Sequence, residues 1–403
     1  MTSTDQIIKQ SLDRVERWIE AHDFKGYEPF DGLTSYLYPL TLGNKVACQV
    51  LQQAVRRFPL NLRPILGIRP LHSTKGRGYL AWGYLKRHKL EGSRLYKDKA
   101  LGCLNWLDQN KSPAHKNHSW GNHFRYASRS GFIFKHESTI VWTGLIGQVF
   151  LEAYALYKIP RLLEVIKSIA DWMMELPREE TADGLCLSYI MRHQSSIHNS
   201  NMIGAAFLAG AAPICGYPEY QAVARRAMEY SCTRQLKDGA WYYGEDPMYH
   251  WVDVFHTGYN LDALKRYQEY SGDPSFSNSE KIGYEFFRDH FFEPSGRVRY
   301  YHDRPRPIDI QCASQALDTL VLFSREDPEA IALADKTALW YIHRMQGRDG
   351  HFYFRHYAPG INNTAATIHW GQATMHKALA HLLLLERRLE KQGPPTEETP
   401  ARS

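Results

Sequence analysis

Side chains that could carry out chemistry are concentrated in residues 235–262. A turn dipeptide, Asp238-Gly239, is followed by β-prone aromatic residues and then by a helix-like apolar pattern near Leu261. Carboxylates and histidines can transfer protons, and indole or phenol rings can stack on the faces of sugars. Enzymes often place such groups where a loop meets a rigid helix. The candidates in this stretch are Tyr243, Glu245, Trp251, Asp253, His256 and Tyr259.

Similar segments recur along the chain, and they indicate how these side chains are positioned. Turn glycines occur at Gly184, Gly239, Gly296 and Gly350, about 55 residues apart. Each is followed by a β-prone tail, a polar loop and an apolar helical stretch, and a second helical stretch returns to the next turn. Six such units would fill the chain and close into a ring. We therefore predict an all-α fold, an (α/α)6 toroid with short β-hairpins at its mouth.

The same pattern sets the domain organisation. Residues 1–391 are predicted to form a single toroid domain, with amphipathic helices over about 6–22 and 45–57 and a loop-like segment over 61–78. The polar, Pro-rich tail 392–403 is predicted to be disordered.

In such a ring, the polar residues that precede each inner helix converge on one mouth. Asp253 and Asp309 are the predicted acid–base pair, with Glu245 as a substitute, although helix capping explains either aspartate equally well. His198 and His256 are predicted to bind substrate or tune the pKa values of the acids, and each could equally be a hydrogen-bonded core histidine. The predicted binding residues, which would stack on sugar rings or hold hydroxyls and carboxylates, are Tyr243, Trp251, Tyr259, Trp370, Asn199, Arg355, His369 and Gln372.

Three of the polar residues could instead form a metal site. Asp309, Cys312 and His369 would meet if the repeats stack in order, and such a trio can hold zinc. The spacing is loose, however, and Cys312 fits the pattern of a small apolar helix residue, so we expect no metal. The sequence contains no Gly-rich phosphate loop, no GxSxG and no HExxH, and no cofactor is expected.

Composition excludes some functions. Hydrophobic residues make up 43% and charged residues 23% of the 403, as in soluble globular proteins. The net charge of +6 is mild and its cations are scattered, so no nucleic-acid partner is expected. No run reaches the length of a membrane span, and the polar start of the chain lacks a signal segment. Six dispersed cysteines favour reduced thiols. We expect a cytoplasmic protein, and nothing in the sequence specifies its oligomeric state.

Six motifs carry a resemblance to known proteins: GYEPFDGL (26–33), SWGNHFRYASRSGFIFKHESTIV (119–141), DGAWYYGED (238–246), WVDVFHTGYNLDAL (251–264), IDIQCASQALDTL (308–320) and HWGQATMHKAL (369–379). The chain resembles the six-hairpin, (α/α)6 superfamily of carbohydrate-active proteins, which includes N-acylglucosamine 2-epimerases, unsaturated glucuronyl hydrolases and glucuronyl C5-epimerases. More specifically, it resembles a poorly characterised family associated with bacterial polysaccharide biosynthesis. The resemblance implies a toroid and a glycan substrate, and it assigns no catalytic residue.

The sequence departs from known toroid families at two places, and each departure argues against a function. In the family that the chain resembles, segment 119–141 would have an acidic residue near Arg125-Tyr126. This chain lacks that residue, so the segment is not assigned the role of a subsite. The segment QLKDGAW is similar to a turn motif of terpene cyclases and prenyltransferases, which share the toroid. The chain has no Asp-Asp pair and no DxDD segment, so we do not expect an ionisation-driven cyclase.

Three functions are compatible with these residues. The first is hydrolysis of a glycosidic bond in a bacterial polysaccharide or oligosaccharide by an aspartate pair. The second is epimerisation or β-elimination at a uronic acid or amino sugar, with His198, His256 or His369 moving the proton. The third is a non-catalytic glycan-binding or scaffold protein of a polysaccharide-biosynthesis complex.

Overall fold

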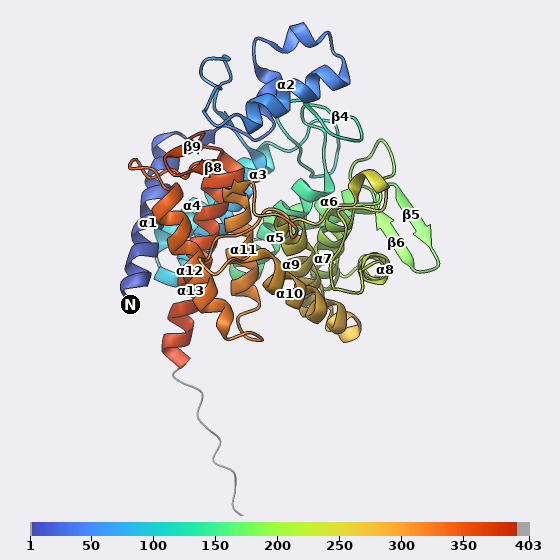
Figure 1. Ribbon diagram of the computed structural model, residues 1–403. Coiled ribbons are helices and arrows are strands. Elements are labelled where there is room, and N and C mark those ends of the chain that lie inside the picture. The colour runs from blue at the N-terminus through green and yellow to red at the C-terminus, as the bar shows by residue number, and fades with distance from the viewer. Residues whose placement is uncertain (1, 393–403) are drawn as a thin grey trace, which may run out of the picture.

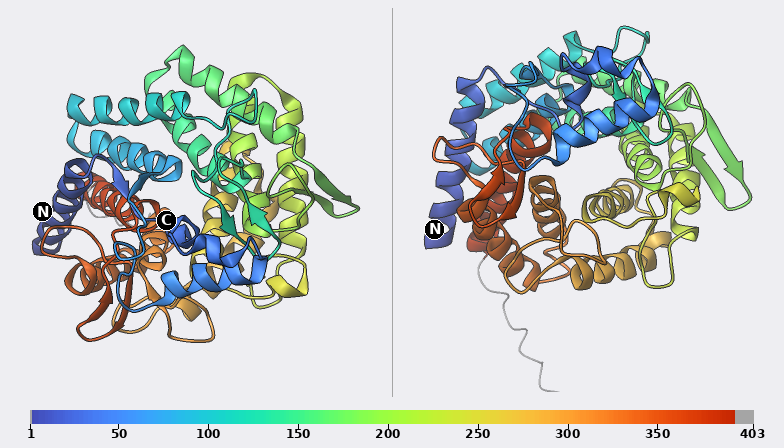
Figure 2. Two further views of the ribbon diagram at one scale, coloured as in Figure 1. Left: turned by 90° about the horizontal axis from the view of Figure 1, so that it is seen from above. Right: turned by 45° about the horizontal axis from the view of Figure 1, so that its top comes forward.

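A computed structural model describes residues 2–392, with side chains described up to Leu385. Six helices form a closed inner ring and six more pack outside it (Figures 1 and 2). The inner helices are α3 (Thr74–Glu91), α5 (Ile140–Tyr157), α7 (His198–Cys215), α9 (Val254–Ser271), α11 (Ile310–Leu322) and α13 (Ala373–Gln392). The outer helices are α1 (Ser3–Ala21), α4 (Arg94–Gln109), α6 (Pro160–Met174), α8 (Pro218–Thr233), α10 (Ser277–Phe291) and α12 (Glu329–Met345).

The ring closes because its last inner helix packs against its first, α13 on α3, and α1 packs against α12 and α13. The prediction of an (α/α)6 toroid is therefore confirmed. The predicted tail, apart from Gln392, lies outside the described residues.

The periodic glycines have a steric cause. Gly184 has φ +123°, and a Cβ there would lie 2.3 Å from the backbone oxygen of Arg226 in α8. Gly239 has φ +93°, and a Cβ there would lie 2.2 Å from the backbone oxygen of Ile282 in α10. Only glycine fits a left-handed turn pressed this closely on a helix. Each repeat thus fastens its turn to the next outer helix.

Short strands connect the helices; most lie near the mouth of the ring, and the β5–β6 hairpin projects from its side (Figures 1 and 2). They form the pairs β1 (Lys25–Gly26) with β2 (Leu71–His72), β3 (Tyr126–Ala127) with β4 (Phe132–Ile133) and β5 (Arg178–Thr181) with β6 (Gly184–Leu187), and the antiparallel sheet of β7 (Ile308–Asp309), β8 (Arg355–Ala358) and β9 (Ile361–Asn363). The predicted β-tails after Gly239 and Gly296 form only isolated bridges.

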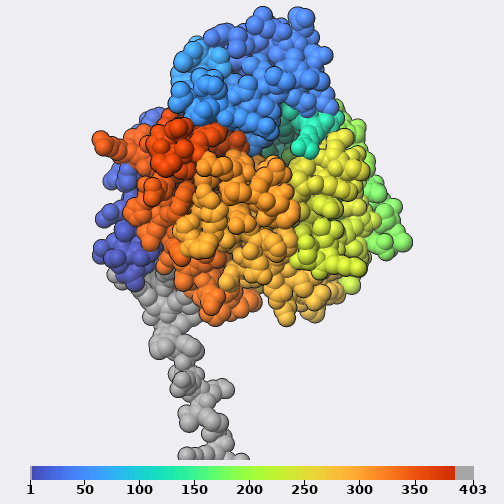
Figure 3. Space-filling view, in the orientation of Figure 1, coloured from blue at the N-terminus to red at the C-terminus, as the bar shows by residue number. Residues whose placement is uncertain are grey.

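A segment between α1 and α3 stands outside the ring and covers part of its mouth. It contains the short helices η1 (Asp31–Thr34) and η2 (Tyr38–Thr41) and the helix α2 (Lys45–Arg57), at the top of Figure 1 and in blue in Figure 3. The buried ion pair between Arg63 Nε and Asp31, at 2.9 Å, ties this segment together. The predicted helix over 45–57 is confirmed. The loop predicted over 61–78 is wrong at its end, because α3 begins at Thr74.

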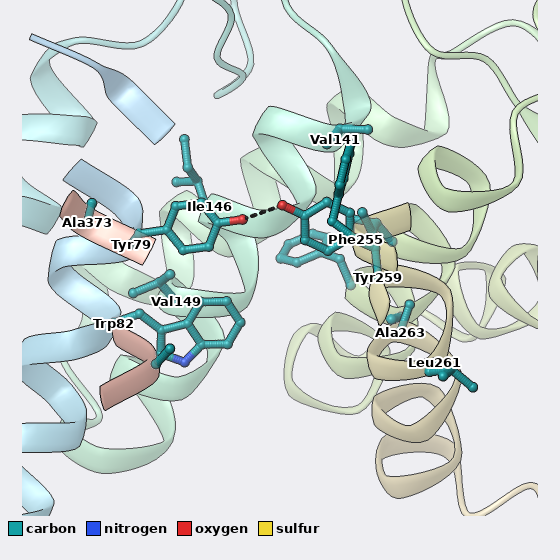
Figure 4. Close-up of a cluster of buried hydrophobic side chains, with 14 of the residues drawn as sticks. Tyr79, Trp82, Val141, Ile146, Val149, Phe255, Tyr259, Leu261, Ala263 and Ala373 are labelled. Atoms are coloured by element: carbon teal, nitrogen blue, oxygen red, sulfur yellow. Dashed lines mark hydrogen bonds between the residues drawn. The ribbon is translucent and has the colours of Figure 1, made fainter. Parts of the chain in front are cut away.

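The inner helices are buried on almost all sides because they contact both the outer helices and one another. Figure 4 shows side chains of α3, α5 and α9 filling the space inside the ring. Among them, the hydroxyl groups of Tyr79 and Tyr259 are hydrogen-bonded at 3.0 Å. Below the mouth the ring is thus a packed core.

One helix bears on the expectation that no run is long enough to span a membrane. By length and composition α5 is long and apolar enough, with 18 residues and a mean hydropathy of 1.3. Of this stretch 67% is buried inside the protein, as in the core helix of a soluble protein.

Candidate active site

A cavity of about 470 Å³ lies at the mouth of the ring. Its walls come from the segments that precede α5, α7, α9, α11 and α13, from the first turn of α3, and from α2 and the β3–β4 hairpin. Eight of the predicted site residues line it: Asn199, Tyr243, Trp251, Asp253, His256, Tyr259, His369 and Trp370. The predicted convergence on one mouth is therefore correct for these side chains.

Asp253 and His256 form the best-defined polar pair in the cavity wall. Asp253 is 2% exposed and caps α9, since its Oδ1 accepts the backbone N–H of His256 at 3.0 Å. Its Oδ2 accepts hydrogen bonds from the indole Nε1 of Trp251 at 2.9 Å and from Nδ1 of His256 at 2.7 Å. With Nδ1 donating to the carboxylate, the lone pair of His256 is on Nε2. Asp253 thus caps the helix and orients a histidine.

Asp309 does not reach the cavity, contrary to its predicted role beside Asp253. It is fully buried, and its Oδ2 accepts a hydrogen bond from Nε of Arg355 at 2.8 Å. Its Oδ1 caps α11 through the backbone N–H of Gln311. Arg355 is likewise buried and outside the cavity lining. The buried carboxylate and guanidinium satisfy each other's hydrogen-bonding groups, and this pair connects α11 to the β8 strand.

Three other predicted residues also lie outside the cavity lining. His198 is buried, and its Nε2 contacts Oε1 of Glu245 at 2.7 Å. The hydrogen bond from His198 is the main cause that lowers the pKa of Glu245. Gln372 is fully buried and uses its amide on the backbone N–H and C=O of Phe352. These side chains hold the mouth loops in place.

The structure adds Lys75, which the sequence reasoning missed. It lies in the first turn of α3, is 7% exposed and lines the cavity. Its Nζ lies 4.8 Å from the ring centre of Trp142 and 5.6 Å from that of Tyr259. Burial lowers the pKa of Lys75 to about 7, although the Glu28 carboxylate opposes this shift. In the described part of the chain, no carboxylate forms an ion pair with Lys75.

A second histidine reaches the cavity beside Lys75. His369 lines the wall, and its ring lies 5.2 Å from that of Trp142. Its Nδ1 makes a close ion-pair contact with the buried carboxylate of Glu28. Burial lowers the pKa of His369 below its ordinary value, and Glu28 opposes that change. Glu28 was not among the predicted residues, although it lies within the GYEPFDGL motif.

The cavity wall carries an excess of positive charge. Its cations are Arg56, Arg57, Lys75 and Arg129, whereas Asp253 is the single Asp or Glu among the described residues that line it. The guanidinium of Arg56 lies over Phe30, 4.6 Å from its ring centre, and Nη2 donates to the hydroxyl of Tyr300 at 3.3 Å. The carboxylate of Asp253 already accepts hydrogen bonds from Trp251 and His256. The cations therefore dominate the charge that a ligand meets, and the wall favours an anionic ligand.

The wall also presents buried polar atoms without a hydrogen-bond partner in the described part of the protein. Besides His369, whose Nδ1 contacts Glu28, six residues that line the cavity have such an atom: Arg56 Nε, Asn122 Oδ1, Trp142 Nε1, Asn199 Oδ1, Gln311 Oε1 and Trp370 Nε1. Buried polar groups are nearly always satisfied in proteins. A ligand with many hydroxyl groups would supply both donors and acceptors to them.

No group of three or more His, Cys, Asp or Glu among the described residues is arranged to hold a metal ion. Of the three residues that could have held zinc, Asp309 is paired with Arg355 and His369 with Glu28. Cys312 is fully buried in α11, and burial raises the pKa of its thiol.

Solved structures resemble this chain at low sequence identity. A cellobiose 2-epimerase from Bacillus thermoamylovorans matches with 9% identity and a TM-score of 0.60, covering 78% of this chain and 88% of the epimerase. An unsaturated glucuronyl hydrolase specific for heparin matches with 12% identity and a TM-score of 0.63, covering 96% and 97%. A polysaccharide lyase matches with 10% identity and a TM-score of 0.59, covering 96% and 99%.

No protein-family model matches the sequence, and no curated protein matches it. The likeness to these structures extends over most of the chain. It shows that the protein has the (α/α)6 toroid fold found in carbohydrate-active epimerases, hydrolases and lyases.

Proposed function

We propose that the protein is a carbohydrate-active enzyme that moves a proton at a ring carbon of an acidic sugar, as an epimerase or lyase does. One observation carries this proposal: Asp253, the single acidic side chain among the described cavity-lining residues, is committed to orienting His256. Glycoside hydrolysis by the common route needs two carboxyl groups that flank the bond to be cleaved. The cavity instead offers an oriented imidazole.

His256 is the proposed general base. Its neutral Nε2 would take the proton from the carbon next to the carboxylate of the sugar, and Asp253 would stabilise the imidazolium that forms. The electrons of the broken C–H bond then spread onto the carboxylate. Cations near the developing charge lower the barrier for this step, and Lys75 and Arg56 are the candidates in the wall.

The fate of the proton distinguishes the two reactions. In epimerisation a proton returns to the opposite face of the carbon. His369, held by Glu28 through Nδ1, is the candidate; it would give this proton from Nε2 as the imidazolium and regain it from solvent. In β-elimination the carbanion instead expels the oxygen substituent on the neighbouring carbon, which leaves with the C–O electron pair and takes the proton that His256 removed. The unpartnered polar atoms and the rings of Trp251 and Trp370 support a sugar as the ligand. The predicted cytoplasmic location and the link to polysaccharide biosynthesis stay predictions.

The test is proton exchange with solvent. The protein is incubated in deuterated water with uronic-acid oligosaccharides and with neutral oligosaccharides of the same linkage, and the products are analysed by mass spectrometry and proton NMR. Deuterium on a ring carbon, or an unsaturated sugar, is expected with the acidic substrates only. His256→Gln should abolish this signal, and His250→Gln, at an exposed histidine outside the cavity lining, should retain it.

Two other outcomes would overturn the proposal. New reducing ends without carbon-bound deuterium would indicate hydrolysis. Tight binding without any product across the panel would indicate a glycan-binding or scaffold protein.

A further inference from the structure

The segment 36–71 exposes more large apolar side chains than the rest of the described chain. Nine of the fourteen exposed large hydrophobic side chains among the described residues belong to it: Tyr36, Leu40, Leu42, Val46, Val50, Phe58, Leu60, Ile65 and Leu71. Leu42 is 93% exposed and Leu40 is 77% exposed. Exposed apolar side chains concentrated in one segment are a feature of interaction surfaces.

The charges of the same segment have one sign. It contains Lys45, Arg56, Arg57, Arg63 and Arg69 and no Asp or Glu. Arg63 is buried and paired with Asp31, whereas Lys45, Arg57 and Arg69 are exposed. In the described part of the chain, none of these three forms an ion pair. An occupant of this surface must therefore accept both aliphatic side chains and positive charge.

Helix α2 shows how the segment relates to the cavity. Gln49, Gln52 and Arg56 line the cavity on one side of this helix. Val46 and Val50, one turn apart, are exposed on another side and are 65% and 63% exposed. The helix thus separates the cavity from an apolar outer surface, and Figure 3 shows the blue segment projecting from the top of the molecule.

We propose that the 36–71 surface docks on an anionic lipid bilayer. Leu40, Leu42 and Val46 would enter the boundary between headgroups and acyl chains, and Lys45 and Arg69 would contact anionic headgroups. An amphipathic surface with this combination of aliphatic and cationic side chains is typical of proteins that lie on a membrane. Docking would place the cavity mouth close to the membrane surface.

The observations favour a bilayer over a second copy of the chain. A symmetric dimer through this surface would bring its cations against the same cations of the partner, without acidic residues to offset them. Side chains as exposed as Leu40 and Leu42 would also need matching pockets in a protein partner, whereas a bilayer accepts them without a preformed pocket.

The test is flotation of the full-length protein with vesicles. Wild type is expected to float with vesicles of equal parts phosphatidylcholine and phosphatidylglycerol, to bind phosphatidylcholine alone much more weakly, and to be released by salt. Lys45→Gln with Arg69→Gln should weaken binding to the anionic vesicles by about fivefold for each cation removed. Leu42→Ser with Val46→Ser should also reduce flotation.

The matched control is Leu95→Ser with Leu156→Ser, at exposed leucines in α4 and α5 outside this surface, which should float like wild type. In a Val50→Trp variant, the fluorescence emission of the introduced tryptophan should shift to shorter wavelengths with anionic vesicles only. Absence of flotation by wild type, or unchanged flotation of Leu42→Ser with Val46→Ser, would overturn the proposal. If wild type were a dimer without vesicle binding, and Leu42→Ser with Val46→Ser were a monomer, the surface would be an interface between copies instead.

Discussion

Oδ2 of Asp253 lies 2.7 Å from Nδ1 of His256, and the same oxygen accepts the indole N–H of Trp251 at 2.9 Å. This carboxylate connects the cap of an inner helix, an aromatic wall residue and the proposed base. Replacing Asp253 with Asn would place an amide N–H opposite Nδ1. His256 would then adopt the tautomer that carries its proton on Nε2, which cannot accept a proton from substrate.

For Asp253→Asn we therefore expect kcat to fall at least ~100-fold, as when a carboxylate that orients a catalytic histidine is replaced. Stability should fall by ~1–3 kcal/mol, because Asn still caps the helix but its amide leaves the indole N–H of Trp251 without an acceptor. Steady-state kinetics and thermal unfolding measure the two effects separately. Turnover within a few-fold of wild type would show that Asp253 does not position the base.

Replacing Asp309 should reduce stability and leave turnover nearly unchanged, in contrast to Asp253→Asn, which mainly reduces turnover. Asp309→Ala leaves the buried guanidinium of Arg355 without its carboxylate, and breaking such a buried pair costs ~3–5 kcal/mol of stability. Turnover per folded molecule should stay close to that of wild type. Urea unfolding and active-site titration provide the two readouts.

The control for Asp309→Ala removes both charges, as Asp309→Leu with Arg355→Met. An uncharged pair of similar volume should restore part of the lost stability. Loss of turnover in Asp309→Ala at unchanged stability would instead favour the aspartate pair that the sequence suggested.

The contrast between Asp253 and Asp309 shows what the sequence could predict. Both precede an inner helix at the same phase of the repeat, and both cap that helix. Whether the second carboxylate oxygen faces the cavity or a buried cation depends on a partner elsewhere in the chain. For Asp309 this partner is Arg355, which β8 brings alongside β7. Repeat phase alone could not reveal that pairing.

The fold was predictable because the turn glycines repeat for a steric reason, the close approach of each turn to an outer helix. The first repeat lacks a turn of this type, and its inner helix α3 was assigned in part to a loop. Lys75 was missed for that reason, although it stands at the start of an inner helix like Asn199 and His256. Applying the repeat phase to Thr74-Lys75-Gly76 would have found it.

Lys75 leads to a prediction on pH. Its pKa of about 7 lies below the ordinary 10.5, so the folded protein carries a neutral amine as the pH rises above 7. Only the ammonium form attracts a carboxylate, so affinity for an acidic sugar should decrease as the pH rises through 7. Binding should also take up a proton near neutral pH, since the bound anion raises the pKa of Lys75. Calorimetry in buffers of different ionisation enthalpy measures this uptake.

Two variants provide the controls for this pH effect. Lys75→Arg keeps the charge at all these pH values, so it should bind without the pH dependence. Lys75→Met should bind acidic sugars weakly throughout. The other titratable groups beside Lys75 are Glu28, His369, Tyr79 and Tyr259. Burial lowers the pKa of His369 below 6.5 and raises the pKa values of both tyrosines above 10, so these three titrate outside the window near pH 7 to 8. An unchanged pH dependence in Lys75→Met would assign the effect to another group.

Arg56 should determine the preference for acidic over neutral sugars. Its guanidinium lies over the rings of Phe30 and Trp370, at 4.6 and 5.1 Å, and faces the cavity beside Tyr300. A charge-assisted hydrogen bond to a carboxylate contributes ~1.5–3 kcal/mol. Arg56→Gln should therefore raise KM for a uronic-acid substrate by at least ~10-fold and leave the weak binding of the neutral analogue unchanged.

Arg94→Gln, at an exposed cation on α4 outside the cavity, is the control. An equal loss for both sugars would mean that Arg56 shapes the wall without reading the charge of the substrate.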